Sequence, residues 1–320
     1  MTESAQVQSP PARRLFGWSL LRALRNPRPN SQLLWGLGCA APALLGFGLW
    51  KVVPVVASFI VALTNWNVAR SPQWVGLENF RRMLFHDPLF WKSLWVTSLY
   101  AAVGVPIAMT CAFALALLLN TGTPGQRIFR TLFYLPSIMP TIAVSVLWLW
   151  ILNPDLGLLN ALLDQIGVPH VQWLTSETLV LPTLILMSLW NLGPMMIIFL
   201  AALQDVPQQL YDAVSIDGGG AWARLRHVTI PLITPAILFN LVMGLVAALQ
   251  TFTQAYVMTD GGPNNASLFL VFYIYREGFR NSNIGYASAL SWGLFAIIAV
   301  LSAVVFTSAK HWVHYEGGER

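Results

Sequence analysis

A polar segment, Leu210–Pro235, interrupts a chain that is otherwise mostly apolar. It contains two Asp, two Arg, one His and three consecutive Gly. Ionised side chains on a well-ordered surface make strong, charge-assisted hydrogen bonds to a partner of opposite charge. The residue types of this segment therefore indicate binding to another macromolecule, with Asp212 as the leading candidate contact.

Motifs for covalent chemistry are absent from the rest of the chain. Lys51, Lys92 and Lys310 are its lysines, and none follows a Gly, so no G-x-x-x-x-G-K-[ST] phosphate-binding loop is present. Neither G-x-S-x-G nor H-E-x-x-H occurs, and the five His lie outside the long apolar runs. Cys39 and Cys111 both fall inside apolar runs and are expected to be small buried hydrophobes. We therefore predict no catalytic residue, no metal and no cofactor in this chain, and no enzyme activity.

The composition indicates that membrane-spanning helices flank and position the polar segment. The 320 residues are 56% hydrophobic and 10% charged, whereas a soluble domain carries about 25% charged residues. This predicts an all-α, multi-pass membrane protein embedded in a lipid bilayer. The net charge of +5 does not indicate nucleic acid, because five Arg gather before the first apolar run, as expected on the cytoplasmic side of a membrane.

Apolar runs long enough to cross a bilayer, about 20 residues each, occur six times within a predicted permease domain at 33–310. Cytoplasmic tails are predicted at 1–32 and 311–320, and a cytoplasmic loop at 203–233. With both termini inside, the cytoplasmic side holds eleven Lys and Arg, counting Arg130 at the start of the third span, and the outer segments hold six, which supports a cell-membrane protein in this orientation. The predicted spans are 34–64, 93–119, 129–152, 178–202, 234–258 and 284–308.

The polar segment has the pattern of two short helices joined by a turn. Leu210, Ala213 and Val214 fall on one helical face, and Gly218–Gly220 breaks the helix. A second short helix follows, with Trp222 on one side, and Pro231 precedes the fifth span. We expect a stiff elbow held by its own apolar residues, although an ordinary amphipathic cytoplasmic loop fits the bare pattern as well.

This segment resembles the EAA loop of ABC-importer permeases, whose pattern is E-A-A-x-x-D-G-A, about nine further residues, and I-x-L-P. Asp212 stands in the place of the Glu, and Val214 and Gly219 each replace an Ala. The positions that match the pattern are Ala213, Asp217, Gly218, Val228, Ile230 and Pro231. By this resemblance, the ATPase-coupling residues are Asp212, Ala213, Asp217, Gly218 and Pro231, and we add Trp222 from the second short helix.

Other motifs are similar to those of sugar-importer permeases of the maltose and glycerol-3-phosphate type. They are V-G-L-E-N-F (75–80), L-F-Y-L-P (132–136), G-L-L-N-A-L-L (157–163) and M-T-D-G-G-P (258–263). The resemblance implies a second permease subunit, two ATPase subunits that bind the ATP, and an extracytoplasmic solute-binding protein. It also implies that the elbow sits in a cleft of the ATPase, and that the solute is a sugar or sugar-like molecule.

Spans four and five hold polar and small residues suited to a solute path. Amides, hydroxyls and an indole offer hydrogen bonds and a flat surface to a neutral sugar. Small and polar residues also serve as helix–helix contacts in membranes, so both interpretations stay open for each position. The candidates are Ser188, Trp190, Asn191, Gly244, Ala248, Gln250, Thr251 and Gln254.

Two other classes of membrane protein, a secondary carrier and an integral-membrane enzyme, are alternatives to an ABC permease. Secondary carriers often place ionisable groups or broken helices at the centre of the membrane; here every Asp and Glu falls in an expected loop or tail, and no broken span is expected. An integral-membrane enzyme would need a cluster of His, acid or Cys residues at the span ends. An ABC permease for a solute other than a sugar is the nearest alternative.

Overall fold

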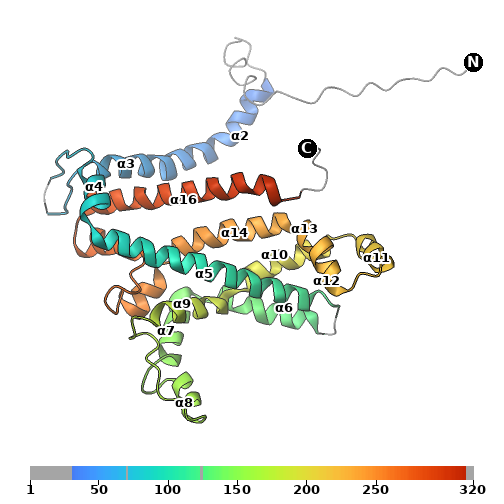
Figure 1. Cartoon of the computed structure of the whole chain (residues 1–320). Helices are drawn as coiled ribbons and strands as arrows, with labels where there is room; N and C mark the ends of the chain where they lie inside the picture. The colour runs from blue at the N-terminus through green and yellow to red at the C-terminus, as the bar shows by residue number, and fades with distance from the viewer. Residues whose placement is uncertain (1–30, 70, 123–124, 315–320) are drawn as a thin grey trace, which may run out of the picture. The chain divides into compact units, whose positions relative to one another are not determined.

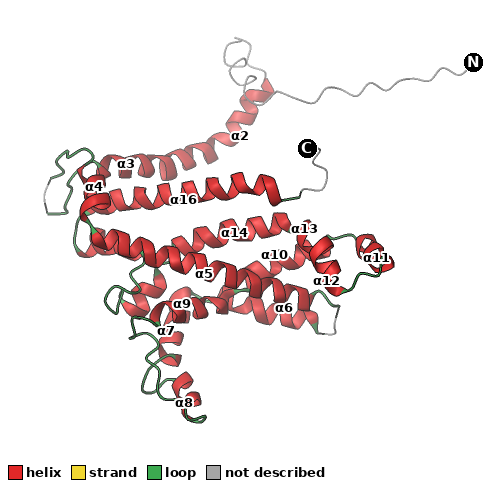
Figure 2. Cartoon of the chain, in the orientation of Figure 1, coloured by secondary structure: helices red, strands yellow, loops and turns green. Residues whose placement is uncertain are grey.

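The computed structural model describes residues 31–69, 71–122 and 125–314 (Figures 1 and 2). The predicted tails, 1–32 and 311–320, lie mostly outside these ranges. The predicted all-α class is confirmed, because within the described ranges the β structure is limited to isolated bridge residues, such as the antiparallel bridge between Thr64 and Trp74. The chain divides into one unit up to Ser58 and a second from Phe59 onward.

The first unit consists of helix α2, a π-helical turn and the beginning of α3. Its residues have exposed or partly exposed side chains wherever these are described. The α-helices of the described residues are α2 (Ser31–Phe47), α3 (Val53–Ala62), α4 (Glu78–Arg81), α5 (Pro88–Leu119), α6 (Gln126–Tyr134), α7 (Thr141–Ile151), α8 (Leu158–Asp164), α9 (Val180–Ser188), α10 (Gly193–Gln204), α11 (Gln208–Ile216), α12 (Ala221–Arg224), α13 (Ile230–Leu232), α14 (Thr234–Leu249), α15 (Leu270–Tyr275) and α16 (Ile284–Trp312).

Among the described residues, three helical stretches are long and apolar enough to cross a membrane: Trp35–Ala62, Pro88–Leu119 and Ile284–Trp312. Three further pairs of helices reach that length only when both members of a bent pair are counted together. The described residues therefore provide three spans, or up to six if each bent pair is one span.

The bends fall in the regions of the third, fourth and fifth predicted spans. The helix Gln126–Ile138 meets α7 at 97°, where Met139 is extended (ψ 138°) because a residue that precedes proline is pushed out of the helical region. Helix α9, with its following 3-10 turn, meets α10 at 51°. The expectation that no span would be broken was therefore wrong. A 65° bend precedes α14, which ends at Leu249, earlier than predicted.

Helix α5 organises the second unit and packs against α6, α9, α10, α14 and α15. Figure 1 shows α5 running along α14, with α16 beyond α14. One apolar cluster surrounds the N-terminal half of α5, and a second surrounds its C-terminal half around Ala112 and Ala116. Fully buried large side chains of these clusters include Leu184, Met196, Phe199, Phe269, Phe272 and Leu290.

Two acidic residues are buried, contrary to the expectation of no buried acids, although both lie in connectors between the predicted spans. Asp87 is 7% exposed and Glu277 is 6% exposed. Asp87 caps the N-terminus of α5, and its Oδ1 accepts hydrogen bonds from the backbone N–H groups of Leu89 and Phe90. Burying a carboxylate is costly unless it is hydrogen-bonded, and both acids have such partners: the Nδ2 atoms of Asn281 and Asn283 donate to Glu277.

Candidate functional site

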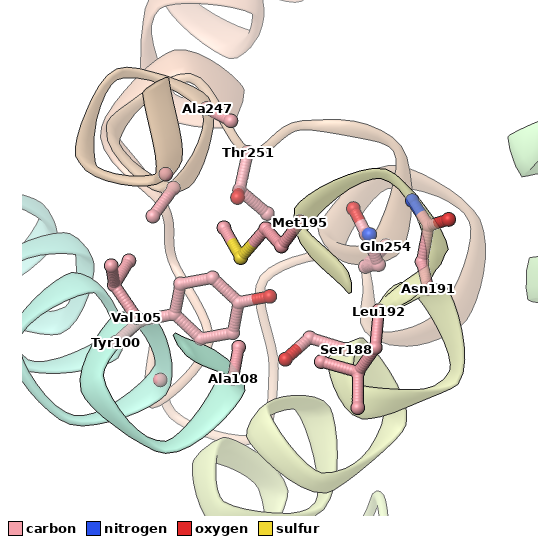
Figure 3. A pocket seen from close by; sticks show the side chains of 13 residues that line it. Tyr100, Val105, Ala108, Ser188, Asn191, Leu192, Met195, Ala247, Thr251 and Gln254 are labelled. Carbon is pink, nitrogen blue, oxygen red and sulfur yellow. The ribbon is translucent and has the colours of Figure 1, made fainter. Parts of the chain in front are cut away.

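A cavity of about 220 Å³ lies where α5, α10 and α14 come together (Figure 3). Its wall combines small and apolar residues with a few hydroxyl and amide groups. This mixture suits a neutral polar molecule, which needs hydrogen bonds for orientation and apolar surface for contact. The lining residues are Tyr100, Gly104, Val105, Ala108, Ser188, Asn191, Leu192, Met195, Gly244, Ala247, Ala248, Thr251 and Gln254.

The polar groups of the cavity come from three elements. The Tyr100 hydroxyl of α5 projects into the cavity, which Ser188 and Thr251 also line (Figure 3). Asn191 lies in the 3-10 turn that breaks the helix between α9 and α10, and Gln254 lies beyond the end of α14. The interruption of both helices therefore brings amide side chains to the same cavity.

Gly244 allows the three cavity helices to approach closely. A Cβ atom at this position would lie 2.9 Å from Cε of Met195 and 3.0 Å from Cγ1 of Val105. Gly193, at the start of α10, permits another close approach, because a Cβ there would lie 2.7 Å from the carbonyl oxygen of Phe133. A larger residue at either position would have to displace its neighbours.

The structure brings six of the eight predicted pathway residues to this cavity: Ser188, Asn191, Gly244, Ala248, Thr251 and Gln254. The other two do not line it. Trp190 packs edge-on against Trp148, with ring centroids 6.0 Å apart, and Gln250 caps the C-terminus of α14 with its side chain exposed. The sequence prediction also omitted the residues of α5 that line the cavity. The one signal in the sequence for them was Tyr100, a hydroxyl-bearing residue within an apolar run.

The segment that resembles the EAA loop forms α11 and a second helix that runs from Ala221 to Leu232. Helix α11 ends in a tight turn: the N–H of Gly219 donates to the carbonyl oxygen of Val214 at 2.8 Å, and Gly218 adopts a left-handed conformation with φ +77°. A Cβ at Gly219 would lie 2.5 Å from Cγ1 of Val214 and 2.9 Å from its carbonyl oxygen. The turn therefore requires glycine for both conformation and space.

Hydrogen bonds between side chains connect α11 to the helix that runs from Ala221 to Leu232. Nη2 of Arg224 donates to Oγ of Ser215 at 2.7 Å. The hydroxyl oxygens of Tyr211 and Thr229 lie 3.1 Å apart and share a hydrogen bond. The expectation that apolar residues hold the elbow together was wrong for Trp222, whose side chain is 69% exposed.

The predicted coupling residues lie mostly on the surface of this segment. Asp212 is exposed, and its Oδ1 accepts a hydrogen bond of 3.3 Å from Nε2 of Gln208. Ala213 and Trp222 are also exposed. Asp217 caps the C-terminus of α11, Gly218 follows it, and Pro231 is half-buried in α13. The carboxylate of Asp212 and the indole of Trp222 are thus exposed on the surface of the helix pair.

In the part of the chain that the structure describes, no group of three or more His, Cys, Asp or Glu could hold a metal ion.

A helical fold with membrane-length helices, a polar cavity between them and a stiff polar helix pair defines the class of membrane-embedded transport subunits. Residues 104–314 match the model of the family described as binding-protein-dependent transport system inner membrane component, and the chain belongs to this family.

Curated relatives match over most of the chain. A probable ABC transporter permease protein, YesP of Bacillus subtilis (strain 168), is 38% identical over 290 residues, which cover 89% of this chain and 94% of YesP. The lactose transport system permease protein LacF of Rhizobium radiobacter is 34% identical over 279 residues, covering 84% of this chain and 92% of LacF.

A solved structure shares the fold. A bacterial ABC transporter involved in the import of alginate contains a chain that superposes with a TM-score of 0.76 at 22% identity, covering 92% of this chain and 98% of that one. The chain is therefore a membrane permease subunit of an ABC importer and not an enzyme, since ATP hydrolysis belongs to a separate subunit.

Proposed function

We propose that this permease forms, with a second permease subunit, the membrane path for a sugar or sugar-like solute. The observation that carries the proposal is the cavity between α5, α10 and α14. It presents the hydroxyls of Tyr100, Ser188 and Thr251 and the amides of Asn191 and Gln254, and among its lining residues no side chain is charged. Such a wall suits a neutral molecule rich in hydroxyl groups.

The functions of two relatives support the sugar class. LacF is a lactose permease protein, and another relative, SmoG of Agrobacterium fabrum, belongs to a sulfoquinovosyl glycerol transport system. Within this proposal the chain has six spans in the inner membrane, with both termini cytoplasmic. Its partners are the second permease, two ATPase subunits and an extracytoplasmic binding protein.

Uptake by cells that carry or lack this gene tests the solute class. We expect deletion to abolish uptake of at least one labelled saccharide from a panel containing lactose, maltose and raffinose, and re-expression to restore it. Labelled methionine and a labelled dipeptide serve as non-sugar controls. Loss of amino acid or peptide uptake, with every saccharide imported normally, would show that the solute belongs to another class.

We also propose that α11 and the helix after it couple the permease to its ATPase. The exposed carboxylate of Asp212 would contact a basic groove of that subunit. Asp212→Lys should abolish solute-stimulated ATP hydrolysis and uptake while the chain still inserts into the membrane. Asp205→Lys reverses a charge at another exposed position near α11 and serves as the control. Normal uptake by the Asp212→Lys transporter would exclude this docking role.

A further inference from the structure

Four aromatic side chains form a continuous series of ring contacts in the connector between α14 and α16. We name this set, Phe252, Tyr256, Tyr275 and Phe279, the aromatic ladder. The ring centroids of Phe252 and Tyr256 lie 5.3 Å apart with their planes inclined by 15°. Tyr256 meets Tyr275 edge-on, also at 5.3 Å. Tyr275 and Phe279 stack with centroids 5.3 Å apart and planes at 26°.

The ladder is anchored on the core and open at its outer rings. Phe272, which contacts Phe252, Tyr256 and Tyr275, is fully buried. Tyr256, by contrast, is 42% exposed and Phe279 is 76% exposed. A large exposed apolar patch that is rimmed by polar residues is typical of an interaction site or a ligand-binding groove.

A charged pair forms the polar rim of the ladder. The guanidinium carbon of Arg280 lies 5.8 Å from the ring centre of Tyr256 and 5.9 Å from that of Tyr275. Its Nη1 atom makes an ion pair of 2.7 Å with Oδ1 of Asp260. A guanidinium has five N–H donors, and one ion pair uses at most two of them. The remaining donors and the second oxygen of Asp260 supply hydrogen-bonding capacity without net charge.

The chain connects the ladder directly to the solute cavity. Phe252 follows Thr251 and precedes Gln254 by two residues, and both of these line the cavity. Helix α14 ends at Leu249, so the ladder begins where the cavity wall leaves this helix. In the orientation proposed above, the connector between the last two spans faces the outside of the cell.

We propose that the aromatic ladder is an outer subsite for a saccharide. The C–H face of a pyranose ring would stack on one of the two exposed rings of the ladder, Tyr256 or Phe279, while Arg280 and Asp260 would hydrogen-bond its hydroxyls. This inference rests on the proposed function. A protein surface could also use aromatic and Arg residues, but the neutral ion pair and the link to the cavity favour a neutral polyhydroxylated ring. The subsite would receive the sugar before it enters the cavity.

The test is uptake of a labelled saccharide by cells with chromosomal substitutions in this permease. The probe is labelled lactose, or another saccharide of the panel that the wild-type cells import. The double substitution Tyr256→Ala with Phe279→Ala should lower the maximal uptake rate roughly 10-fold, because stacking on either ring is lost. The ring-retaining pair Tyr256→Phe with Phe279→Tyr should stay within about twofold of wild type.

Two controls separate a subsite from a structural role. Phe85→Ala removes a ring that is equally exposed, 76%, but lies outside the ladder, and should leave uptake unchanged. The purified double-alanine complex should retain all its subunits and its basal ATP hydrolysis. Unchanged uptake by that variant would overturn the subsite, and loss of subunits would assign the ladder to a protein interface instead. Wild-type cells that import no saccharide would refute the proposed function itself.

Discussion

The phenol oxygen of Tyr273 donates a hydrogen bond of 2.5 Å to Oδ2 of Asp87, although the two residues are 186 positions apart in the chain. Tyr286 donates to the same oxygen. Burial, together with the hydrogen bond to Asp87, raises the pKa of Tyr273, so this phenol keeps its proton and acts as the donor. One buried carboxylate thus ties the start of α5 to α15 and α16.

Replacing this carboxylate should destabilise the permease. In Asp87→Asn, an amide N–H₂ group replaces one acceptor, and hydrogen bonds to charged groups contribute about 1.5–3 kcal/mol each. We expect the free energy of unfolding to fall by about 2–3 kcal/mol and the thermal midpoint of the purified complex to drop by several degrees. Glu78→Gln is the control, because Glu78 is exposed and lies 4.0 Å from Arg81. Equal melting of both variants would contradict the role of Asp87.

Adjacent glycines offer a matched test of the turn after α11. A Cβ at Gly219 would lie 2.9 Å from the carbonyl oxygen of Val214, whereas a Cβ at Gly220 meets nothing within 4 Å. Gly219→Ala should therefore displace α11 from the following helix and reduce solute-stimulated ATP hydrolysis at least about fivefold, a barrier increase of about 1 kcal/mol. Gly220→Ala should leave the coupled rate within about twofold of wild type. Measurement of ATP hydrolysis with and without solute in vesicles decides between these outcomes.

The sequence predicts the long helices well and their interruptions poorly. Apolar length alone locates α5 and α16, but proline does not reveal where a span bends. Pro106 lies inside the unbroken α5, whereas a 97° bend occurs at Pro140. Whether a proline bends its span depends on packing. The end of α6 lies close to Gly193 of α10, and the local sequence does not predict that contact.

The sequence predicted the lining residues of the cavity only where an element carries several polar residues. Asn191 and Thr251 stand out in apolar runs, but the α5 wall consists mainly of Gly, Ala and Val around Tyr100. Which face of α5 meets the cavity depends on helix rotation, which the weak polarity of that run does not define. Asp87 was missed for a similar reason, because its tyrosine partners are distant in the sequence.

Protonation of His170 should tighten the connector that contains α8. Nε2 of His170 lies 2.8 Å from Oδ2 of Asp164, and this hydrogen bond, with the negative charge of Asp164, raises the pKa of His170. Because the folded pKa lies above the unfolded value of about 6.5, the stabilisation is fully present below that pH and is lost as pH rises through the raised pKa.

Hydrogen exchange across residues 158–171, corrected for its intrinsic pH dependence, measures this effect. We expect stronger protection at pH 5.5 than at pH 8.5 in the wild type and no such difference in Asp164→Asn. Glu177→Gln changes an exposed acid of the same connector and should keep the wild-type response. Protection that does not change with pH in the wild type would exclude the His170–Asp164 pair as its cause.

Solute recognition in the cavity should depend on Asn191 and Thr251 together. Each neutral hydrogen bond contributes about 1 kcal/mol, so the double substitution Asn191→Ala with Thr251→Ala should lower uptake of the imported saccharide about 30-fold if both side chains bind it. Gln250→Ala is the matched control, because Gln250 neighbours Thr251 but does not line the cavity. Initial uptake rates, normalised to the amount of permease in the membrane, measure the effect. Wild-type rates in the double variant would remove both residues from the solute path, since each is placed there by its contact with the same 220 Å³ cavity.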